Sequence, residues 1–107
     1  KIRPLGLAMA RRSPALPDLK TIGEQGIAGV EAYTWAGLYG PAGMSPAIAQ
    51  RLNVELLKSL ADPENAKKMA DLGYELQPSS PAELTAHTAA ELKKWTEVAK
   101  AADVKPD

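Results

Sequence analysis

The chain has 107 residues, with 13 basic and 13 acidic side chains and no cysteine. A length of this order suits one domain around a single core. The absence of cysteine excludes disulfides and thiolate metal sites. Because the basic residues are scattered, no stripe is available to neutralise nucleic-acid phosphates, and we predict no nucleic-acid partner.

The first part of the chain combines a short strand with an irregular linker. Residues 2–9 are mostly apolar and are typical of a strand, with Pro4 favouring an edge or an end because proline donates no backbone hydrogen bond. Pro14 and Pro17 each disfavour helical geometry in the residue before them, so residues 10–20 are expected to be irregular.

A short helix and a long strand are predicted next. Thr21 and Glu24 have the spacing of a capping box, and Gly26 is a typical helix end. Residues 30–40 are rich in aromatic and β-branched side chains, which indicates a strand that ends at the turn following Gly40.

The second half has a helical period. Ser45-Pro46 begins a helix that extends through Ala61 and repeats apolar side chains every four residues. A second helix follows Asp62 and ends at Gly73.

The last predicted elements are a brief strand and the longest helix of the chain. Residues 74–77 alternate like a strand. Ser80 and Glu83 form a second capping box, which begins a helix extending to Ala102.

These elements predict an α/β fold with two main strands and three to four helices. Two strands and a stub are only marginally stable in water, so either helices cover this sheet or its partner strands lie outside this sequence. The chain also opens at Lys1, directly into a strand-like segment, without an initiator methionine. We therefore expect a processed protein or a piece of a longer one.

Many modest motifs, in the right order, resemble the last third of Bug-type solute-binding proteins, the receptors of tripartite tricarboxylate transporters. The matching stretches are residues 1–8, 12–18, 21–26, 33–43, 52–53, 60–63, 72–73 and 80–83, together with Trp95. The departures are Met44-Ser45, where Thr-Pro is more usual, and His87, where an aliphatic or aromatic residue is common.

The resemblance implies the C-terminal portion of a two-lobed periplasmic binding protein of type II that closes on a small organic carboxylate. Residues 1–40 would supply a strand, a Pro-rich linker, a short helix and a hinge-type strand, and residues 41–107 a helical segment that completes one lobe. It further implies a non-enzymatic periplasmic receptor that works with membrane transporter subunits, its signal sequence lying outside this chain. The glycine- and serine-rich turns that grip the ligand carboxylate in the family, where backbone amides at helix starts favour an anion, would lie upstream.

Tyr33, Thr34 and Trp35 are the candidate ligand-binding residues. Alternation along a strand places Tyr33 and Trp35 on one face and Thr34 on the other. An aromatic wall with a hydroxyl suits a carboxylate that must be oriented and shielded from water. The alternative is that Trp35 is a core residue packed under a helix.

The other chemically interesting residues favour ordinary structural roles. His87 has only Glu83 and Glu91 at helical spacing, which does not make a catalytic or metal site. Ser13 and Ser45 lack the glycine-flanked elbow of a nucleophile and are expected in a turn and a helix cap.

The charged and glycine-rich stretches also favour structural roles over binding or catalytic ones. Arg11-Arg12 could steer an anion or contact an acidic transporter surface, but solvated loop charges are the simpler interpretation. The carboxylates of residues 62, 64 and 71 form no provable acid–base pair. Gly37, Gly40 and Gly43 are followed by no phosphate-loop lysine. We predict no catalytic residue, metal or cofactor.

Two other functions stay open from the sequence alone. The chain could be a self-associating interaction or structural module without its own ligand site, because an isolated segment of this kind exposes strand edges and apolar surface. It could also be one lobe of a small hydrolase, although the nucleophile–base pairing of such an enzyme is missing.

Overall fold

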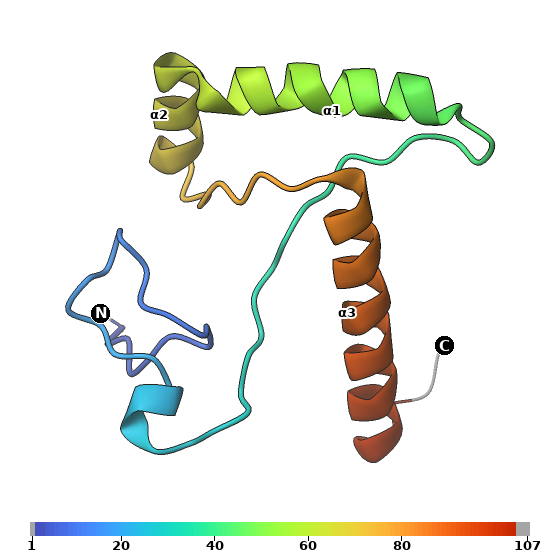
Figure 1. Cartoon of the computed structure of the whole chain (residues 1–107). Coiled ribbons are helices and arrows are strands. Elements are labelled where there is room, and N and C mark those ends of the chain that lie inside the picture. The colour runs from blue at the N-terminus through green and yellow to red at the C-terminus, as the bar shows by residue number, and fades with distance from the viewer. Residues whose placement is uncertain (1, 105–107) are drawn as a thin grey trace. The chain divides into compact units, whose positions relative to one another are not determined.

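The computed structural model describes residues 2–104, and over this range the regular structure is helical (Figure 1). The elements are the one-turn 3₁₀ helix η1 (Gly23–Gln25) and the α-helices α1 (Pro46–Ala61), α2 (Pro63–Asp71) and α3 (Pro81–Ala101). The chain divides into two compact units between Gly37 and Leu38. The first unit contains η1, and the second contains α1, α2 and α3.

Each α-helix begins where the sequence predicts, with a capping side chain followed by proline. The Ser45 side chain accepts a hydrogen bond from the backbone amide of Ile48 at 3.3 Å. Asp62 ends α1 and caps α2, and its Oδ1 accepts from the amide of Glu64 at 3.0 Å. Proline at the first position leaves one fewer amide without an intrahelical acceptor. The predicted helix starts are confirmed.

Two asparagine side chains form hydrogen bonds that join elements of the second unit. Asn53 Nδ2 donates to the carbonyl of Ser79 at 2.9 Å and so ties α1 to the approach of α3. Asn65 Nδ2 donates to the carbonyl of Ser59 at 3.1 Å across the corner between α1 and α2. The helix α1 also packs against both α2 and α3.

The first unit is held by hydrogen bonds between loops. Leu7 donates its backbone amide to Lys20 O at 3.0 Å and accepts from the amide of Ile22 at 2.9 Å, which makes an isolated parallel bridge between Leu7 and Thr21. The capping box is present, but the helix that it begins is the single turn of η1, shorter than expected. Gly26 ends it with φ of 94°, a conformation that favours glycine.

The strands predicted at residues 2–9, 30–40 and 74–77 are wrong: no strand forms within residues 2–104, and the α/β prediction is corrected to a helical structure. β propensity measures how a side chain packs against a neighbouring strand, so it produces a strand only where a partner exists. The longest of these segments is extended, and it donates the amide of Ala32 to the carbonyl of Ala8 at 3.0 Å.

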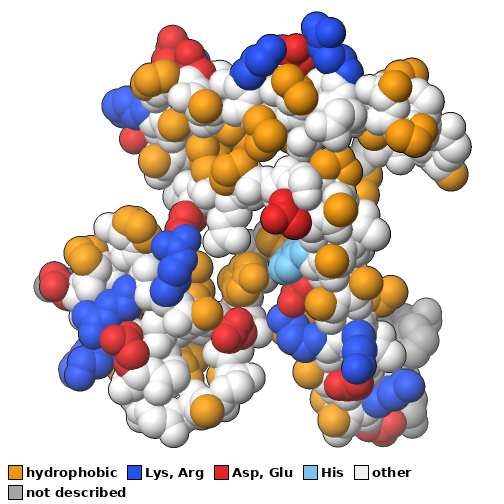
Figure 2. All heavy atoms as spheres, viewed as in Figure 1, with side chains coloured by type: hydrophobic (Ala, Val, Ile, Leu, Met, Phe, Trp, Pro, Cys, Tyr) orange, Lys and Arg blue, Asp and Glu red, His pale blue; other side chains and the backbone are white. Residues whose placement is uncertain are grey.

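The expected single core is also wrong for the described residues. Among them Thr21, with 3% of its surface exposed, is buried, and no hydrophobic side chain is. Leu92 is 70% exposed and Trp95 43%, although both lie on the apolar face that the helical period of α3 predicts. Figure 2 shows hydrophobic side chains on the visible surface of the helices. The apolar stripes are present, but three helices alone do not cover them.

Candidate functional site

The candidate residues Tyr33, Thr34 and Trp35 lie in the extended segment at the end of the first unit. Tyr33 is 36% exposed, Thr34 is exposed and Trp35 is half-buried. The hydrogen bond from Ala32 to Ala8 anchors this segment immediately before Tyr33. The tyrosine ring and the threonine hydroxyl are therefore accessible, while the indole of Trp35 is partly covered.

Arg12 and Glu24 form the most elaborate polar cluster of the first unit. Arg12 Nε donates to Glu24 Oε2 at 2.9 Å, and Nη2 donates to Oε1 at 2.8 Å. Arg12 Nη1 also donates to the carbonyl of Pro17 at 3.1 Å. Such a bidentate fork holds both partners in one geometry. Arg12 therefore joins the Pro-rich loop to η1 and is committed to a structural role.

Glu24 completes this cluster through the buried Thr21. Its Oε2 accepts the backbone amide of Thr21 at 2.8 Å, while the Thr21 hydroxyl accepts the amide of Glu24 at 3.1 Å. The side-chain hydrogen bond from Arg12, followed by that from the Thr21 amide, lowers the pKa of Glu24 from 4.5 to about 2. This carboxylate stays ionised at every physiological pH.

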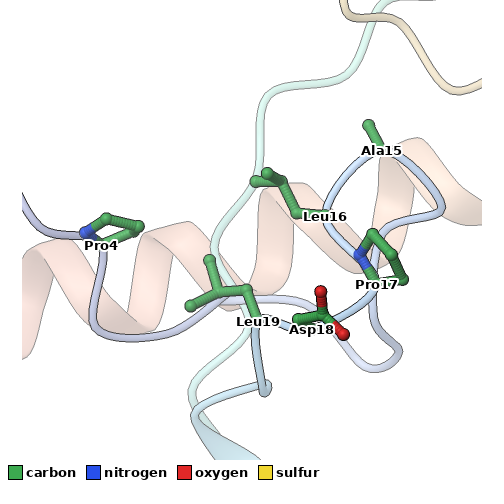
Figure 3. Close-up of a pocket in the computed structure, with 6 residues that line it drawn as sticks. All are labelled: Pro4, Ala15, Leu16, Pro17, Asp18 and Leu19. Carbon is green, nitrogen blue, oxygen red and sulfur yellow. The ribbon is translucent and has the colours of Figure 1, made fainter.

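Two open hollows lie among the described residues of the first unit. One, of about 390 Å³, is lined by apolar residues and Asp18 (Figure 3). The other, of about 450 Å³, is lined partly by η1 and includes Glu24 and Glu31. No basic side chain is among the described residues that line either hollow, and the carboxylate of Glu24 is paired with Arg12.

A chain of hydrogen bonds connects the segment after the candidate residues to α3. The hydroxyl oxygens of Tyr39 and Thr88 lie 2.7 Å apart, and Thr88 Oγ1 donates to the carbonyl of Leu84, also at 2.7 Å. Tyr39 and Thr88 are 49 residues apart. No local sequence pattern predicts this contact.

Trp95 is held on the surface of α3 by its neighbours. Its Nε1 donates to Glu91 Oε2 at 2.9 Å, and Lys94 Nζ lies 5.0 Å from the ring centroid while also forming an ion pair with Glu91. A cation above an indole ring is attracted by the negative face of the ring.

The predicted turn position of Ser13 and the predicted cap position of Ser45 are confirmed. Ser13 Oγ accepts the amide of Ala15 at 3.2 Å in a turn, and Ser45 caps α1. Lys67 and Asp71 form a surface ion pair at 2.6 Å.

His87 is half-buried on α3. Across residues 2–104, no group of histidine, cysteine, aspartate and glutamate side chains could hold a metal ion. Over the same range no helix has the length and apolar character needed to cross a bilayer.

Comparison with known proteins identifies the family. Residues 1–104 match the model of the tripartite tricarboxylate transporter family receptor. The chain is 32% identical over 96 residues to the UPF0065 protein in the tcbD-tcbE intergenic region of a Pseudomonas species, covering 89% of the chain and 29% of that protein. It is 29% identical over 96 residues to the UPF0065 protein in the clcB-clcD intergenic region of Pseudomonas knackmussii, covering 89% of the chain and 57% of that protein.

These matches extend over nearly all of the chain, whereas the chain spans 29% and 57% of the lengths of the two relatives. The family consists of periplasmic solute-binding receptors, which confirms the prediction of a non-enzymatic protein and implies a portion of a periplasmic binding protein fold. The chain belongs to the receptor family of tripartite tricarboxylate transporters.

Proposed function

We propose that this chain is the C-terminal part of a type II periplasmic receptor that captures a small organic carboxylate and delivers it to the membrane subunits of a tripartite tricarboxylate-type transporter. The observation that carries the proposal is the family match over residues 1–104. In this proposal residues 1–40 supply hinge and linker elements, and residues 41–107 complete one lobe.

Tyr33, Thr34 and Trp35 form one wall of the ligand site in this proposal. The accessibility of Tyr33 and Thr34 supports it, because Tyr33 is 36% exposed and Thr34 is exposed in a segment anchored at Ala32. An aromatic side chain that lies against a ligand excludes water, and a hydroxyl can orient a carboxylate by donating to it.

The amides that hold the ligand carboxylate belong, in this proposal, to a region outside the present sequence. The hollows of the first unit support this division, since no basic side chain is among their described lining residues to attract a carboxylate. The three α-helix starts support it as well. In each of them the side chain of the capping residue, Ser45, Asp62 or Ser80, already accepts at least one amide of the first turn.

Thermal unfolding of the natural polypeptide that contains this sequence tests the proposal. Mono-, di- and tricarboxylates are added at millimolar concentration, and the corresponding neutral amides serve as matched controls. A ligand at 100 times its Kd stabilises the folded state by about 2.7 kcal/mol, which moves the melting temperature by several degrees. We expect at least one carboxylate to raise the melting temperature, and its amide to leave it unchanged. A carboxylate panel without any effect would contradict the proposal.

Self-association is a second candidate function for the isolated chain, favoured by its exposed apolar side chains. Among residues 2–104 no hydrophobic side chain is buried, and Leu92 and Trp95 are exposed on α3. Apolar surface of this kind tends to associate. Light scattering of the 107-residue chain is expected to give a mass above 11.4 kDa that rises with concentration. A monomeric mass at every concentration would rule this candidate out.

A further inference from the structure

The hydrogen bond between Tyr39 and α3 has a defined direction. A threonine hydroxyl carries one hydrogen, and that of Thr88 is donated to the carbonyl of Leu84 at 2.7 Å. Thr88 Oγ1, which lies 2.7 Å from the Tyr39 hydroxyl, is therefore the acceptor in this pair. Both residues belong to the second unit, so the contact lies wholly within one compact part of the chain.

The surroundings of Thr88 differ from those of two other threonines on α3. Thr85 and Thr96 also donate their hydroxyls to the carbonyl four residues earlier, at 2.8 and 2.7 Å, and both residues are exposed. Thr88 makes the same backbone bond but is half-buried. The Tyr39 side chain accounts for part of this cover, because its hydroxyl lies against Thr88.

Tyr39 lies in a short segment, residues 38–44, which we call the strap. The strap begins the second unit and ends at the residue before the α1 cap. Its last residue, Met44, donates its amide to the carbonyl of Pro41 at 3.2 Å. The Met44 side chain lies against Gly40, because a Cβ added at Gly40 would meet Met44 Sδ at 2.9 Å. These contacts fold the strap on itself, so it can move as one piece.

The helices α1 and α3 are joined by contacts that do not involve the strap. Asn53 Nδ2 on α1 donates to the carbonyl of Ser79, immediately before α3, at 2.9 Å, and the two helices pack against each other. Release of the strap from Thr88 therefore leaves these connections intact.

We propose that the strap is a conformational device that opens and closes on α3, with the hydrogen bond from Tyr39 to Thr88 as its clasp. Burial contributes little to the closed state, because Tyr39 keeps 56% of its surface exposed. The hydrogen bond then raises the ratio of closed to open strap about fivefold. A local opening of this kind is populated in the native protein, and it uncovers Thr88 while α1 and α3 stay together. The inference requires no ligand and does not depend on the proposed function.

Acetylation of tyrosine hydroxyls by N-acetylimidazole measures the clasp in the natural polypeptide. Tyr74 is the matched control: it is 58% exposed, against 56% for Tyr39, and its hydroxyl makes no hydrogen bond with another described residue. The rates at both residues are read from peptide masses. We expect Tyr39 to react about fivefold more slowly than Tyr74. Equal rates in the wild type would overturn the proposal.

Variants of Thr88 test whether this residue is the acceptor of the clasp. Thr88→Val removes the acceptor with little change in volume and is expected to raise the rate at Tyr39 to that at Tyr74. Thr88→Ser keeps a hydroxyl and should retain the protection. Thr96→Val removes an equivalent hydroxyl elsewhere on α3 and should leave the rate at Tyr39 unchanged. Equal responses to Thr88→Val and Thr96→Val would refute the clasp, because the change would then come from a general weakening of α3.

Urea separates opening of the strap from unfolding of the unit. A local opening exposes little surface, so the rate at Tyr39 should not depend on urea below the unfolding transition. Asn53→Ala weakens the connection between α1 and α3, and it should move this transition to lower urea without changing the rate at Tyr39 below it. A rate at Tyr39 that rises with urea well below the transition, while that at Tyr74 stays constant, would contradict the proposal, because the clasp would then open only by unfolding.

Discussion

The capping box at the start of α3 should decide how much of this helix forms. Ser80 Oγ accepts the amide of Glu83 at 3.2 Å, and Glu83 Oε2 accepts the amide of Ser80 at 2.7 Å. Within the described residues the helix buries no side chain, so local interactions contribute a large share of its stability. Replacing Ser80 with alanine removes a capping oxygen, which costs about 1 kcal/mol. This change lowers the equilibrium constant for forming the first turn about fivefold.

Circular dichroism at 222 nm during urea unfolding measures this effect. Ser80→Ala is expected to reduce the ellipticity and to shift unfolding to lower urea concentration, whereas Ser80→Asp retains a capping oxygen and should remain close to the wild type. Thr85→Ala is the matched control within the same helix. It also removes a hydroxyl, but from an interior position where alanine is the better helix former, so the helix content should rise. Equal losses in Ser80→Ala and Thr85→Ala would refute the reasoning.

Three further predictions concern other contacts. Because the pKa of Glu24 is lowered to about 2 in the folded chain, the ionised carboxylate stabilises the fold above pH 4.5, and this stabilisation is lost as the pH falls from 4.5 toward 2. The amide of Thr21 donates a hydrogen bond to Glu24, so its resonance should shift over this pH interval. The same resonance should not shift in the Glu24→Gln variant. Gly73→Ala places a side chain at φ of 83°, where the new Cβ meets no atom within 4 Å beyond its chain neighbours, so backbone strain dominates and urea unfolding should report a loss of about 1 kcal/mol. Asn53→Ala removes the donor to Ser79 O and should cost about 1 kcal/mol in the same assay, and an unchanged midpoint would contradict the role assigned to this bond.

Helix positions in this protein could be predicted from the sequence because they depend on neighbours. The hydroxyl or carboxylate that caps each helix lies within a few residues of the amides that it binds, as Ser45, Asp62 and Ser80 do. The family could be predicted for a related reason. Its motifs occur in a fixed order over the chain, and the match of residues 1–104 to the family model confirms the prediction.

The predicted strands failed because a strand depends on residues elsewhere in space. Residues 30–40 have the composition of a strand and are extended, but within the described chain they have no strand beside them. The expected core failed for the same reason, since an apolar stripe such as that of α3 indicates which face could be covered and does not supply the covering element.

Two polar contacts between residues far apart in the chain also could not be predicted from sequence patterns. Arg12 reaches Glu24 across 12 residues, and Tyr39 reaches Thr88 across 49. Neither pair has a spacing that any secondary structure requires, so composition presented Arg12 as a solvated loop charge and Tyr39 as one aromatic among several. The ligand-binding role of Tyr33, Thr34 and Trp35 remains a prediction.

Isothermal titration of the natural polypeptide with its stabilising carboxylate tests this role most directly, using Trp35→Ala and, as the matched exposed indole, Trp95→Ala. An aromatic side chain that becomes buried against a ligand contributes about 1.5–3 kcal/mol, so the account predicts that Trp35→Ala weakens binding by roughly 10- to 100-fold while Trp95→Ala leaves it unchanged. The same affinity in wild type and Trp35→Ala would contradict the account.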